Sequence, residues 1–360
     1  MKAVVAHAIN DFSVVDVELD PPKVGEVLVR MKATGICHSD LSMINGTLRA
    51  KLPSVLGHEG AGIVEQVGDA VTNVKPGDHV VLSFVPNCGH CYHCDRSEPF
   101  LCQKNKPHGG LLDGTSRVKL NGQEIAVMSF LGNMAEYCVV PSVCVVAVDK
   151  AHDFKAAALV GCGVTTGVGA AIRTAQVKPG STVAVFGCGG VGLNVIQGAR
   201  IAGAAKIIAV DLSVEKMALA REFGATDVVD PAQEAFKQVL DLTGGIGVDY
   251  AFEVVGSGKL VEQCFKATRM NGMTVLVGVG RAEDRFSFNA MIVPFTGKTI
   301  KGCMYGSCNF KVDFPMYLDL YRQKKLDLDR LITRTYSIDE APLAFADLEK
   351  GVNARGVIVY

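Results

Sequence analysis

The stretch "VAVFGCGGVGLNVIQGAR", residues 183–200, passes from a short apolar run through a glycine-rich turn into a helical pattern. The turn holds Gly187, Gly189 and Gly192 in the spacing G-x-G-x-x-G. Glycines in this spacing let the backbone approach a pyrophosphate, which then lies at the positive N-terminus of the following helix. Such a triplet is weak evidence by itself, because glycine recurs in α/β turns.

The residues around this turn supply the context that the triplet lacks. The next strand-like run, "AKIIAVD", ends at Asp211, whose carboxylate can bind a ribose 2′-hydroxyl and would repel a 2′-phosphate. From about 164 to 304, strand and helix patterns alternate, as in a parallel sheet covered on both faces. The alternative is a tight turn followed by a surface aspartate. We expect an α/β, doubly wound Rossmann domain over residues 164–304, with NAD rather than NADP as its cofactor.

The two ends of the chain have a different sequence pattern. Residues 1 to about 150 contain short strand-like runs broken by Gly and Pro, such as "EVLVRMKATG" and "AEYCVVP", which indicate a β-rich domain with long loops. The C-terminal stretch contains two amphipathic helical patterns and ends in the strand-like "GVIVY". We expect this stretch to return to the first domain, so that residues 1–163 and 305–360 form one catalytic unit.

The composition excludes several classes of protein. The 360 residues include 36 basic and 37 acidic side chains, for a formal net charge of −1, so no basic excess points to nucleic acid. We find no signal peptide at the N-terminus and no apolar run near the ~18 residues that span a bilayer. Twelve cysteines without a secretion signal indicate a reducing compartment, where clustered thiols more often bind metal than oxidise. We therefore expect a cytoplasmic protein with no membrane partner.

Four cysteines gather in "CGHCYHCDRSEPFLC", residues 88–102. Their spacing is C-x2-C-x2-C-x7-C, and four thiolates complete a closed, structural zinc tetrahedron. Disulfides do not suit the inferred compartment, the x7 gap is not a usual ferredoxin spacing, and no basic helix nearby suggests a nucleic-acid module. We interpret the segment as a structural zinc site formed by Cys88, Cys91, Cys94 and Cys102.

A second set of metal-binding side chains is scattered along the chain. "GICHSD" offers Cys37, "LGHEGAG" offers His58, and "LVGCGVTTG" offers Cys162. Each is weak alone, because a single buried Cys or His is usually part of a core. Together they form a Cys2His set, which leaves one position of a zinc tetrahedron open for water or substrate.

These motifs, in this order, resemble those of a zinc-dependent medium-chain dehydrogenase/reductase, the family of liver-type and class III-like alcohol dehydrogenases. The segment "GHEGAGIVEQVGDAV", residues 57–71, fits the family's zinc signature, and the match covers nearly the full chain. The resemblance implies a β-rich GroES-like catalytic domain beside the Rossmann domain. It also implies two zinc ions per chain, one catalytic and one structural.

The resemblance implies roles for the residues beside the ligands. In the family, zinc stabilises the alkoxide form of an alcohol and hydride passes to the nicotinamide ring. Ser39 matches the hydroxyl that begins a proton relay, Asp40 a carboxylate that orients His58, and Glu59 a group near the zinc. For Asp40 and Glu59 the alternative is an ordinary loop acid. Ser42 departs from the pattern, because the relay of liver-type members usually ends there at a histidine, and serine cannot act as a base near neutral pH.

Further cofactor contacts follow from aligned positions. His38 and Arg355 match residues that contact the pyrophosphate, and Lys216 is placed beside the adenosine ribose. Surface positions are the alternative for Arg355 and Lys216. The full predicted cofactor set is His38, Gly187, Gly189, Gly190, Val191, Gly192, Asp211, Lys216, Val254, Val279 and Arg355.

The expected substrate pocket is apolar. Its walls by position are Phe84, Met134, Val279 and Met304, as in a slot for the carbon chain or ring of an alcohol; core packing is the alternative. We expect a primary aromatic or medium-chain alcohol and its aldehyde as substrates. A thiol-dependent formaldehyde dehydrogenase, acting on a glutathione or mycothiol adduct, remains open.

Two rival classes also remain, a non-catalytic chain and a zinc-free reductase of the same superfamily. The intact ligands and glycines argue against both. The strand-like "KTIKGCMYGS", residues 298–307, would lie at a sheet edge, and an uncovered edge invites pairing. By resemblance we expect a homodimer or homotetramer.

Overall fold

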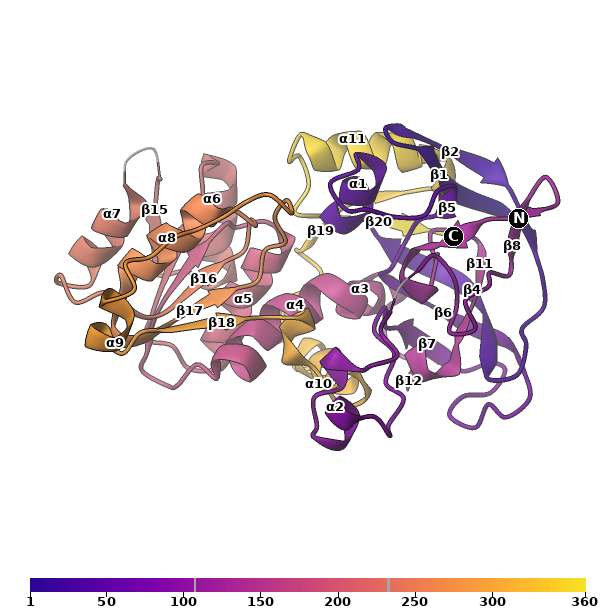
Figure 1. Ribbon diagram of the computed structural model, residues 1–360, viewed down its shortest axis with the longest axis horizontal. Helices are drawn as coiled ribbons and strands as arrows, with labels where there is room; N and C mark the ends of the chain where they lie inside the picture. Colours follow the sequence, from indigo (N-terminus) through magenta and orange to yellow (C-terminus); the bar gives the residue numbers. More distant parts are fainter. Residues whose placement is uncertain (107, 232–233) are drawn as a thin grey trace. The chain divides into compact units, whose positions relative to one another are not determined.

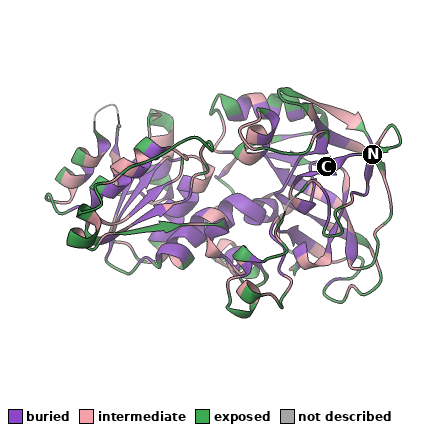
Figure 2. Cartoon of the chain, in the orientation of Figure 1, coloured by how far each residue is buried: buried purple, intermediate pink, exposed green. Residues whose placement is uncertain are grey.

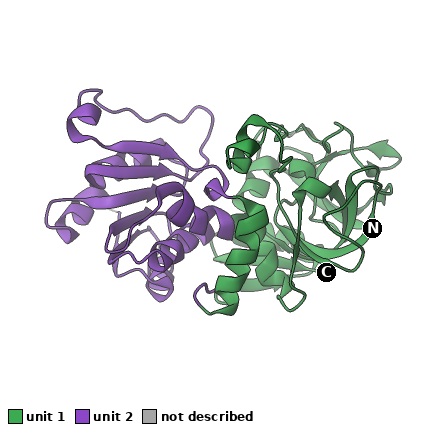
Figure 3. Ribbon diagram, turned by 90° about the horizontal axis from the view of Figure 1, so that it is seen from below, with its two compact units in different colours: residues 1–163, 309–324, 328–360 green, residues 164–308, 325–327 purple. Residues whose placement is uncertain are grey.

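The computed structural model describes residues 1–106, 108–231 and 234–360. The chain divides into two compact units (Figure 3). Unit 1 comprises Met1–Gly163, Asn309–Lys324 and Leu328–Tyr360, and unit 2 comprises Val164–Cys308 and Lys325–Asp327. Most of the C-terminal stretch, residues 309–324 and 328–360, thus lies in unit 1.

Unit 1 is rich in short strands. Its seven-stranded sheet has the order β12-β7-β6-β4-β20-β19, with β11 also paired to β4, and smaller sheets have the orders β10-β5-β1-β2 and β3-β8-β9 (Figure 1). The strands are β1 (Lys2–Ala8), β2 (Asp11–Asp16), β3 (Glu18–Leu19), β4 (Glu26–Gly35), β5 (Ser54–Val55), β6 (Gly60–Val67), β7 (His79–Leu82), β8 (Val118–Leu120), β9 (Gln123–Glu124), β10 (Ala126–Val127), β11 (Tyr137–Pro141), β12 (Val145–Val148), β19 (Ile332–Tyr336) and β20 (Arg355–Val359).

Helices in unit 1 are mostly short and join these strands. They are α1 (His38–Ile44), α2 (Tyr92–Asp95), η1 (Pro99–Leu101), η2 (Met128–Phe130), η3 (Ser142–Cys144), α3 (Phe154–Leu159), α10 (Phe310–Arg322), η7 (Ile338–Glu340) and α11 (Ala341–Glu349). Strand β4 supports the site described below, because it pairs with β6, β11 and β20 and its apolar side chains Val27, Val29 and Met31 are buried in one core cluster.

Unit 2 is built on one parallel sheet of order β15-β14-β13-β16-β17-β18. Chain order reverses between β13 and β16, which is the switch point of a doubly wound fold. The strands are β13 (Thr182–Phe186), β14 (Lys206–Val210), β15 (Asp227–Val229), β16 (Val248–Glu253), β17 (Thr268–Leu276) and β18 (Thr299–Gly302). The helices are α4 (Thr165–Gly169), η5 (Ala170–Ala175), α5 (Gly190–Ile201), α6 (Val214–Phe223), α7 (Ala235–Leu242), α8 (Gly258–Ala267), α9 (Ile292–Thr296) and η6 (Tyr305–Ser307).

Burial explains why the sequence forms this sheet. Residues 183–186 of β13 and 207–210 of β14 are buried, as expected for strands covered on both faces, whose sequences are continuous apolar runs. At the edge of the sheet, all four residues of β18 are exposed, and the strand is green in Figure 2. The predicted edge strand and the α/β fold are therefore confirmed.

The boundary between the units differs from the sequence expectation at two places. Residues 305–308 belong to unit 2, because the hydroxyls of Ser307 and Thr174 are hydrogen-bonded at 2.8 Å. Residues 325–327 also belong to it, because the side chain of Gln197 bonds both the N–H and the carbonyl of Asp327. Side-chain contacts of this kind leave no local pattern in the sequence.

In the described part of the chain, one helical segment, Phe154–Ala175, is long and apolar enough to cross a membrane. It runs through α3, the π-helical turn η4 (Val160–Val164), α4 and η5. In its most apolar window 83% of the residues are buried inside the protein, which is typical of a core helix. The sequence did not suggest such a run, because glycines and threonines interrupt it.

Candidate metal centre and cofactor turn

His58 lies between β5 and β6 of unit 1 and is 3% exposed. Its Nδ1 lies 3.3 Å from Asp40 Oδ1, and the same carboxylate oxygen accepts the N–H of Gly57 at 2.9 Å. Asp40 is fully buried on α1, so it can fix the orientation of the ring. Among the described residues no group bonds His58 Nε2, which leaves this nitrogen available as a ligand.

Cys37, His58, Glu59 and Cys162 come together in unit 1. One potential ligand atom from each lies within 4.8 Å of the others. Cys37 is the N-cap residue of α1, and Cys162 lies in the π-helical turn η4, a distortion that is frequent at functional sites. The structure thus brings together three segments that are far apart in the sequence.

The charges at this centre favour a bound cation. A hydrogen bond from Cys162, together with the nearby His58 and Arg355, lowers the pKa of the Cys37 thiol well below its ordinary value, against the effect of burial. Burial lowers the pKa of His58, but Asp40 and Cys37 raise it further, so its net shift is upward. A proton or a metal ion at Nε2 is therefore stabilised by the surrounding negative charge.

Glu59 and Arg355 form a buried ion pair beside the ligands. Glu59 is fully buried and Arg355 is 5% exposed; the guanidinium bonds the Glu59 carboxylate and the carbonyl of Ile36. Glu59 also accepts the N–H of Gly163 at 2.9 Å. Burial raises the pKa of Glu59 to about 7, although Arg355 opposes the shift. Arg355 is thus not a surface residue, and its contact with a cofactor pyrophosphate stays a prediction.

This donor set fits zinc. Two thiols and an imidazole nitrogen are the ligand types of catalytic zinc sites that keep one position open. The unpartnered His58 Nε2, held from the other side of the ring by Asp40, is the arrangement that such histidines adopt. Glu59 is held by Arg355 instead, so we assign the three-residue set Cys37, His58 and Cys162 as the candidate ligands.

The remaining predicted residues of unit 1 vary in position. Ser39 is half-buried and His38 exposed, both in the first turn of α1. Phe84 meets the His58 ring edge-on, with centroids 5.6 Å apart, and its role as a pocket wall stays a prediction. Met134 is fully buried in a core cluster, so the structure places it as core packing, and its pocket role stays a prediction.

The four-cysteine segment, Cys88–Cys102, forms a separate lobe of unit 1 around α2 and η1. Its four sulfur atoms lie within 4.8 Å of one another, and the Cys88–Cys94 and Cys91–Cys102 sulfur pairs are each 3.9 Å apart. A tetrahedron with Zn–S distances of about 2.3 Å places its sulfurs about 3.8 Å apart, whereas bonded sulfurs lie about 2.05 Å apart. The lobe therefore fits zinc.

The glycine-rich turn follows β13 as predicted. Gly187 has φ = +100°, which favours glycine, and a Cβ on Gly192 would lie 1.9 Å from the Gly187 carbonyl oxygen. Gly189 is the N-cap of α5, without a side-chain cap, and a Cβ there would meet nothing within 4 Å. With Gly190 and Val191 opening α5, this open helix N-terminus fits a pyrophosphate.

Asp211 follows β14 beside the turn. Its carboxylate accepts the N–H groups of Cys188 (2.7 Å) and Ser213 (3.0 Å), so its position relative to the glycines is fixed. Lys216 lies in the first turn of α6. On the other side of the switch point, Val254 follows β16 and is half-buried. Val279 is 73% exposed and Met304 is 38% exposed.

Asn133 was not singled out by the sequence. It is fully buried, and neither atom of its amide has a partner among the described residues. A Cβ on Gly57 would lie 2.5 Å from its Oδ1, and one on Gly60 would lie 2.4 Å from its Nδ2. The amide therefore packs against the two glycines that flank His58 and Glu59, a placement that only the folded chain reveals.

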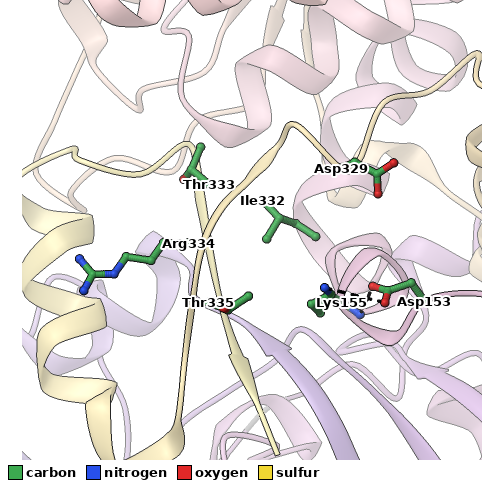
Figure 4. Close-up of a pocket in the computed structure, with 7 residues that line it drawn as sticks. All are labelled: Asp153, Lys155, Asp329, Ile332, Thr333, Arg334 and Thr335. Atoms are coloured by element: carbon green, nitrogen blue, oxygen red, sulfur yellow. Dashed lines mark hydrogen bonds and ion pairs between the residues drawn. The ribbon is translucent and has the colours of Figure 1, made fainter.

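A cavity of about 440 Å³ in unit 1 lies apart from these residues. It is lined by Asp153, Lys155, Asp329, Ile332, Thr333, Arg334 and Thr335 (Figure 4). Lys155 and Asp153, at the start of α3, face each other across 4.0 Å. The lining includes none of the predicted site residues, so we assign it no role in catalysis.

The comparisons with known proteins agree with this geometry. Residues 23–150 match the family profile of the alcohol dehydrogenase GroES-like domain, and residues 190–323 match that of zinc-binding dehydrogenases. An alcohol dehydrogenase zinc-binding domain protein from Burkholderia ambifaria is 33% identical, with a TM-score of 0.95 over 99% of this chain and 98% of that one. Benzyl alcohol dehydrogenase from Acinetobacter calcoaceticus is 32% identical, with a TM-score of 0.94 over the same shares. A proposed zinc-binding dehydrogenase from Sinorhizobium meliloti 1021, bound to NADP, is 27% identical, with a TM-score of 0.82 over 100% of this chain and 99% of that one.

Proposed function

The chain belongs to the zinc-dependent medium-chain dehydrogenase/reductase family, and from this premise we propose that it is an NAD-linked alcohol dehydrogenase for primary aromatic or medium-chain alcohols. As a family member it is an oxidoreductase that acts on alcohols. The observation that carries the proposal is the convergence of Cys37, His58 and Cys162 around an unpartnered His58 Nε2. The reversible reaction moves a hydride between the alcohol carbon and the nicotinamide ring and yields an aldehyde.

Zinc held by Cys37, His58 and Cys162 would supply Lewis-acid polarisation of the substrate oxygen. Asp40 holds the His58 ring by its Nδ1, so Nε2 keeps one direction throughout the reaction. The Ser39 hydroxyl, two residues after Cys37, accepts the proton that leaves the alcohol and passes it on. Ser42 cannot store that proton, so the proton leaves from Ser39 to water.

An aromatic or medium-chain alcohol is favoured by two observations. Phe84, an apolar ring, stands against His58, and apolar walls suit the carbon portion of such a substrate. Benzyl alcohol dehydrogenase is also among the similar solved structures, at 32% identity. The alternative is oxidation of a formaldehyde adduct with glutathione or mycothiol, for which the predicted pocket residues supply no cationic side chain to hold a thiol carboxylate.

NADH formation by the purified protein tests this proposal. Benzyl alcohol and hexanol are compared with formaldehyde premixed with glutathione or mycothiol, each with NAD and with NADP. We expect turnover of the free alcohols with NAD. Turnover of the thiol adduct alone would replace the substrate assignment, and a zinc-free, fully folded preparation would support the rival zinc-free reductase or non-catalytic chain.

Asp211 supports the choice of NAD. Its carboxylate is fixed beside the glycine-rich turn by two N–H groups, where it would bind a 2′-hydroxyl and repel a 2′-phosphate. We expect Asp211→Ala to narrow the preference for NAD over NADP in kcat/KM by about tenfold, since one charge-assisted hydrogen bond is lost. An unchanged preference would contradict the role of Asp211 in selecting NAD. Because one similar structure is bound to NADP, NAD and NADP have to be compared directly.

The protein is further proposed to be a cytoplasmic homodimer or homotetramer. The edge strand β18 is exposed along its whole length, and Phe295, on α9 just before it, is 80% exposed. An uncovered edge with apolar neighbours favours pairing with a second copy. Light scattering of Phe295→Asp should show a smaller assembly than the wild type, whereas Leu343→Asp, an exposed position on α11 in unit 1, should leave the mass unchanged.

A further inference from the structure

Glu253 ends β16 at the point where strand order reverses. It lies beside Phe186, the last residue of β13, in the parallel register. In a doubly wound sheet each half binds one mononucleotide at the carboxyl ends of its strands. The glycine-rich turn and Asp211 belong to the half led by β13, so the loops after β16 and β17 belong to the half that receives the nicotinamide mononucleotide.

The carboxyl group of Glu253 organises the first of these loops. Its Oε1 accepts the N–H groups of Val255 (2.9 Å), Gly256 (2.8 Å) and Ser257 (3.2 Å). Its main-chain carbonyl accepts the N–H groups of residues 277 and 278, at 2.8 and 3.0 Å. One residue thus holds the loop after β16 and the loop after β17.

The two loops are in backbone contact at glycines. Gly256 has φ = +90°, and a Cβ there would lie 2.5 Å from the carbonyl carbon of Val279. A Cβ on Gly278 would lie 2.1 Å from the nitrogen of Gly256 and 2.8 Å from Glu253 Oε2. Neither loop can shift without the other. A carboxylate that fixes the loop after β16 by accepting its hydrogen bonds therefore also fixes the loop after β17.

Packing alone does not account for this carboxyl group. Glu253 is 1% exposed, and its Oε2 has no hydrogen-bond partner among the described residues. Burial raises the pKa of Glu253, against the three N–H groups that lower it. An unpaired buried oxygen destabilises the fold, so its presence here calls for an explanation. Asp284, which accepts the N–H of Gly258 at 2.9 Å, adds a second carboxylate beside it.

We propose that Glu253 is a positioning residue for the cofactor, which sets the backbone of residues 254–257 and 277–280 to receive the nicotinamide mononucleotide half. The inference rests on the proposed NAD-linked function. Glu253 is expected to strengthen binding of the nicotinamide half of the cofactor. It should not affect binding of the adenosine half, which the glycine-rich turn and Asp211 hold.

The opposite end of the same strand offers a matched control. Asp249 of β16 accepts the N–H and the hydroxyl of Thr182, at 2.8 and 2.9 Å, and pairs with Arg269. It is likewise a carboxylate that ties β16 to its neighbours, but it lies at the amino end of the strand, away from the cofactor edge. Asp249→Asn therefore shows how the loss of a structural carboxylate in this sheet affects stability and cofactor binding.

The test measures the binding of NADH and of AMP to the zinc-loaded full-length protein, by cofactor fluorescence and by calorimetry. Glu253→Ala should weaken NADH binding about tenfold while AMP binding stays within about twofold, because one cluster of hydrogen bonds is lost from one half-site. KM for NAD should rise by a similar factor, with little change in KM for the alcohol. Glu253→Gln, whose amide oxygen can still accept the three N–H groups, should restore NADH binding. Asp249→Asn should lower the melting temperature and leave both affinities unchanged.

Three outcomes would overturn the inference. The first is wild-type affinity for NADH in Glu253→Ala. The second is an equal loss of affinity for NADH and AMP in that variant. The third is a selective loss of affinity for NADH in Asp249→Asn. If Glu253→Ala does not fold, Glu253→Asp, whose shorter side chain draws the oxygen away from the loop, carries the same comparison. Failure of the wild type to bind NADH would instead overturn the proposed function itself.

Discussion

The two candidate zinc sites use similar ligand atoms and are built in opposite ways. In the lobe, the four cysteines fall within residues 88–102, and three of them are partly exposed. In the centre, Cys37, His58, Glu59 and Cys162 come from three distant segments, and three of these four are buried. The lobe is supported by the short helices α2 and η1, whereas the centre is supported by β4, β6 and the start of a long helical segment.

The difference indicates what each site is for. Four thiols would complete the coordination of a metal in the lobe and leave no position for a substrate, so a metal bound there would hold a loop and take no part in catalysis. The centre lacks one ligand, and charged groups adjoin it: Asp40 contacts His58, and Glu59 pairs with Arg355. A buried and electrostatically organised site with an open position is where chemistry is expected.

Removal of a centre ligand should have the largest effect. His58→Ala should lower kcat/KM by at least about 1000-fold, because Lewis-acid stabilisation of several kcal/mol is lost. Zinc analysis should show about one ion per chain instead of about two, with the remaining ion in the four-cysteine lobe. If His58→Ala keeps its activity with one zinc ion per chain, the catalytic and structural roles of the two sites are reversed.

The proton path should have the next largest effect. Ser39→Ala should lower turnover by about 100-fold, within the usual range for a group that transfers a proton, while both zinc ions are retained. Full activity in this variant would remove Ser39 from the relay.

Ser42→His tests the other end of the same path. It should add an ionisation near pH 6.5 to the pH–rate profile, since histidine titrates there. Ser42→Ala is the matched control and should leave the profile unchanged. A profile for Ser42→His that coincides with the wild type would show that the proton does not pass this position.

A ligand of the lobe should affect stability more than catalysis. Cys102→Ser should lower the melting temperature by roughly 5–10 °C, since a structural zinc contributes several kcal/mol of local folding energy. Limited proteolysis should cut within residues 88–102 faster than in the wild type, because the lobe opens more often, while activity stays within about threefold. A loss of activity as large as that of His58→Ala would end the distinction between the two sites.

The sequence predicted the lobe better than the centre for a physical reason. All four lobe ligands lie in one short loop, so their spacing alone indicates the tetrahedron. The centre depends on contacts between distant segments, so its Cys2His set was a weaker signal until the family resemblance supported it. The doubly wound sheet was predicted because each strand–turn–helix unit is local, and the family and the fold class are confirmed.

What the sequence did not show arises from long-range packing. Arg355 is buried against Glu59, Met134 lies in a core cluster, and Asn133 packs on the glycines around His58. No periodicity marks these positions. Glu253 was likewise hidden, because its role depends on a loop that closes back onto its own carboxyl group.

The smallest predicted effect is a difference in reactivity between two thiols of the lobe, Cys91 and Cys94, in protein from which a chelator has removed zinc. Hydrogen bonds from the backbone N–H groups of Cys94 and Gln103 lower the pKa of Cys91 to about 6, whereas burial raises that of Cys94 to about 12. Because the thiolate is the reactive form, iodoacetamide should label Cys91 at pH 7 and about tenfold more slowly at pH 5, where its thiol is protonated. Cys94 should stay unlabelled at both values. Peptide mass spectrometry measures the labelling of each of the two thiols. Equal labelling of Cys91 and Cys94 at pH 7 would mean that the lobe does not keep these backbone hydrogen bonds once its zinc is removed.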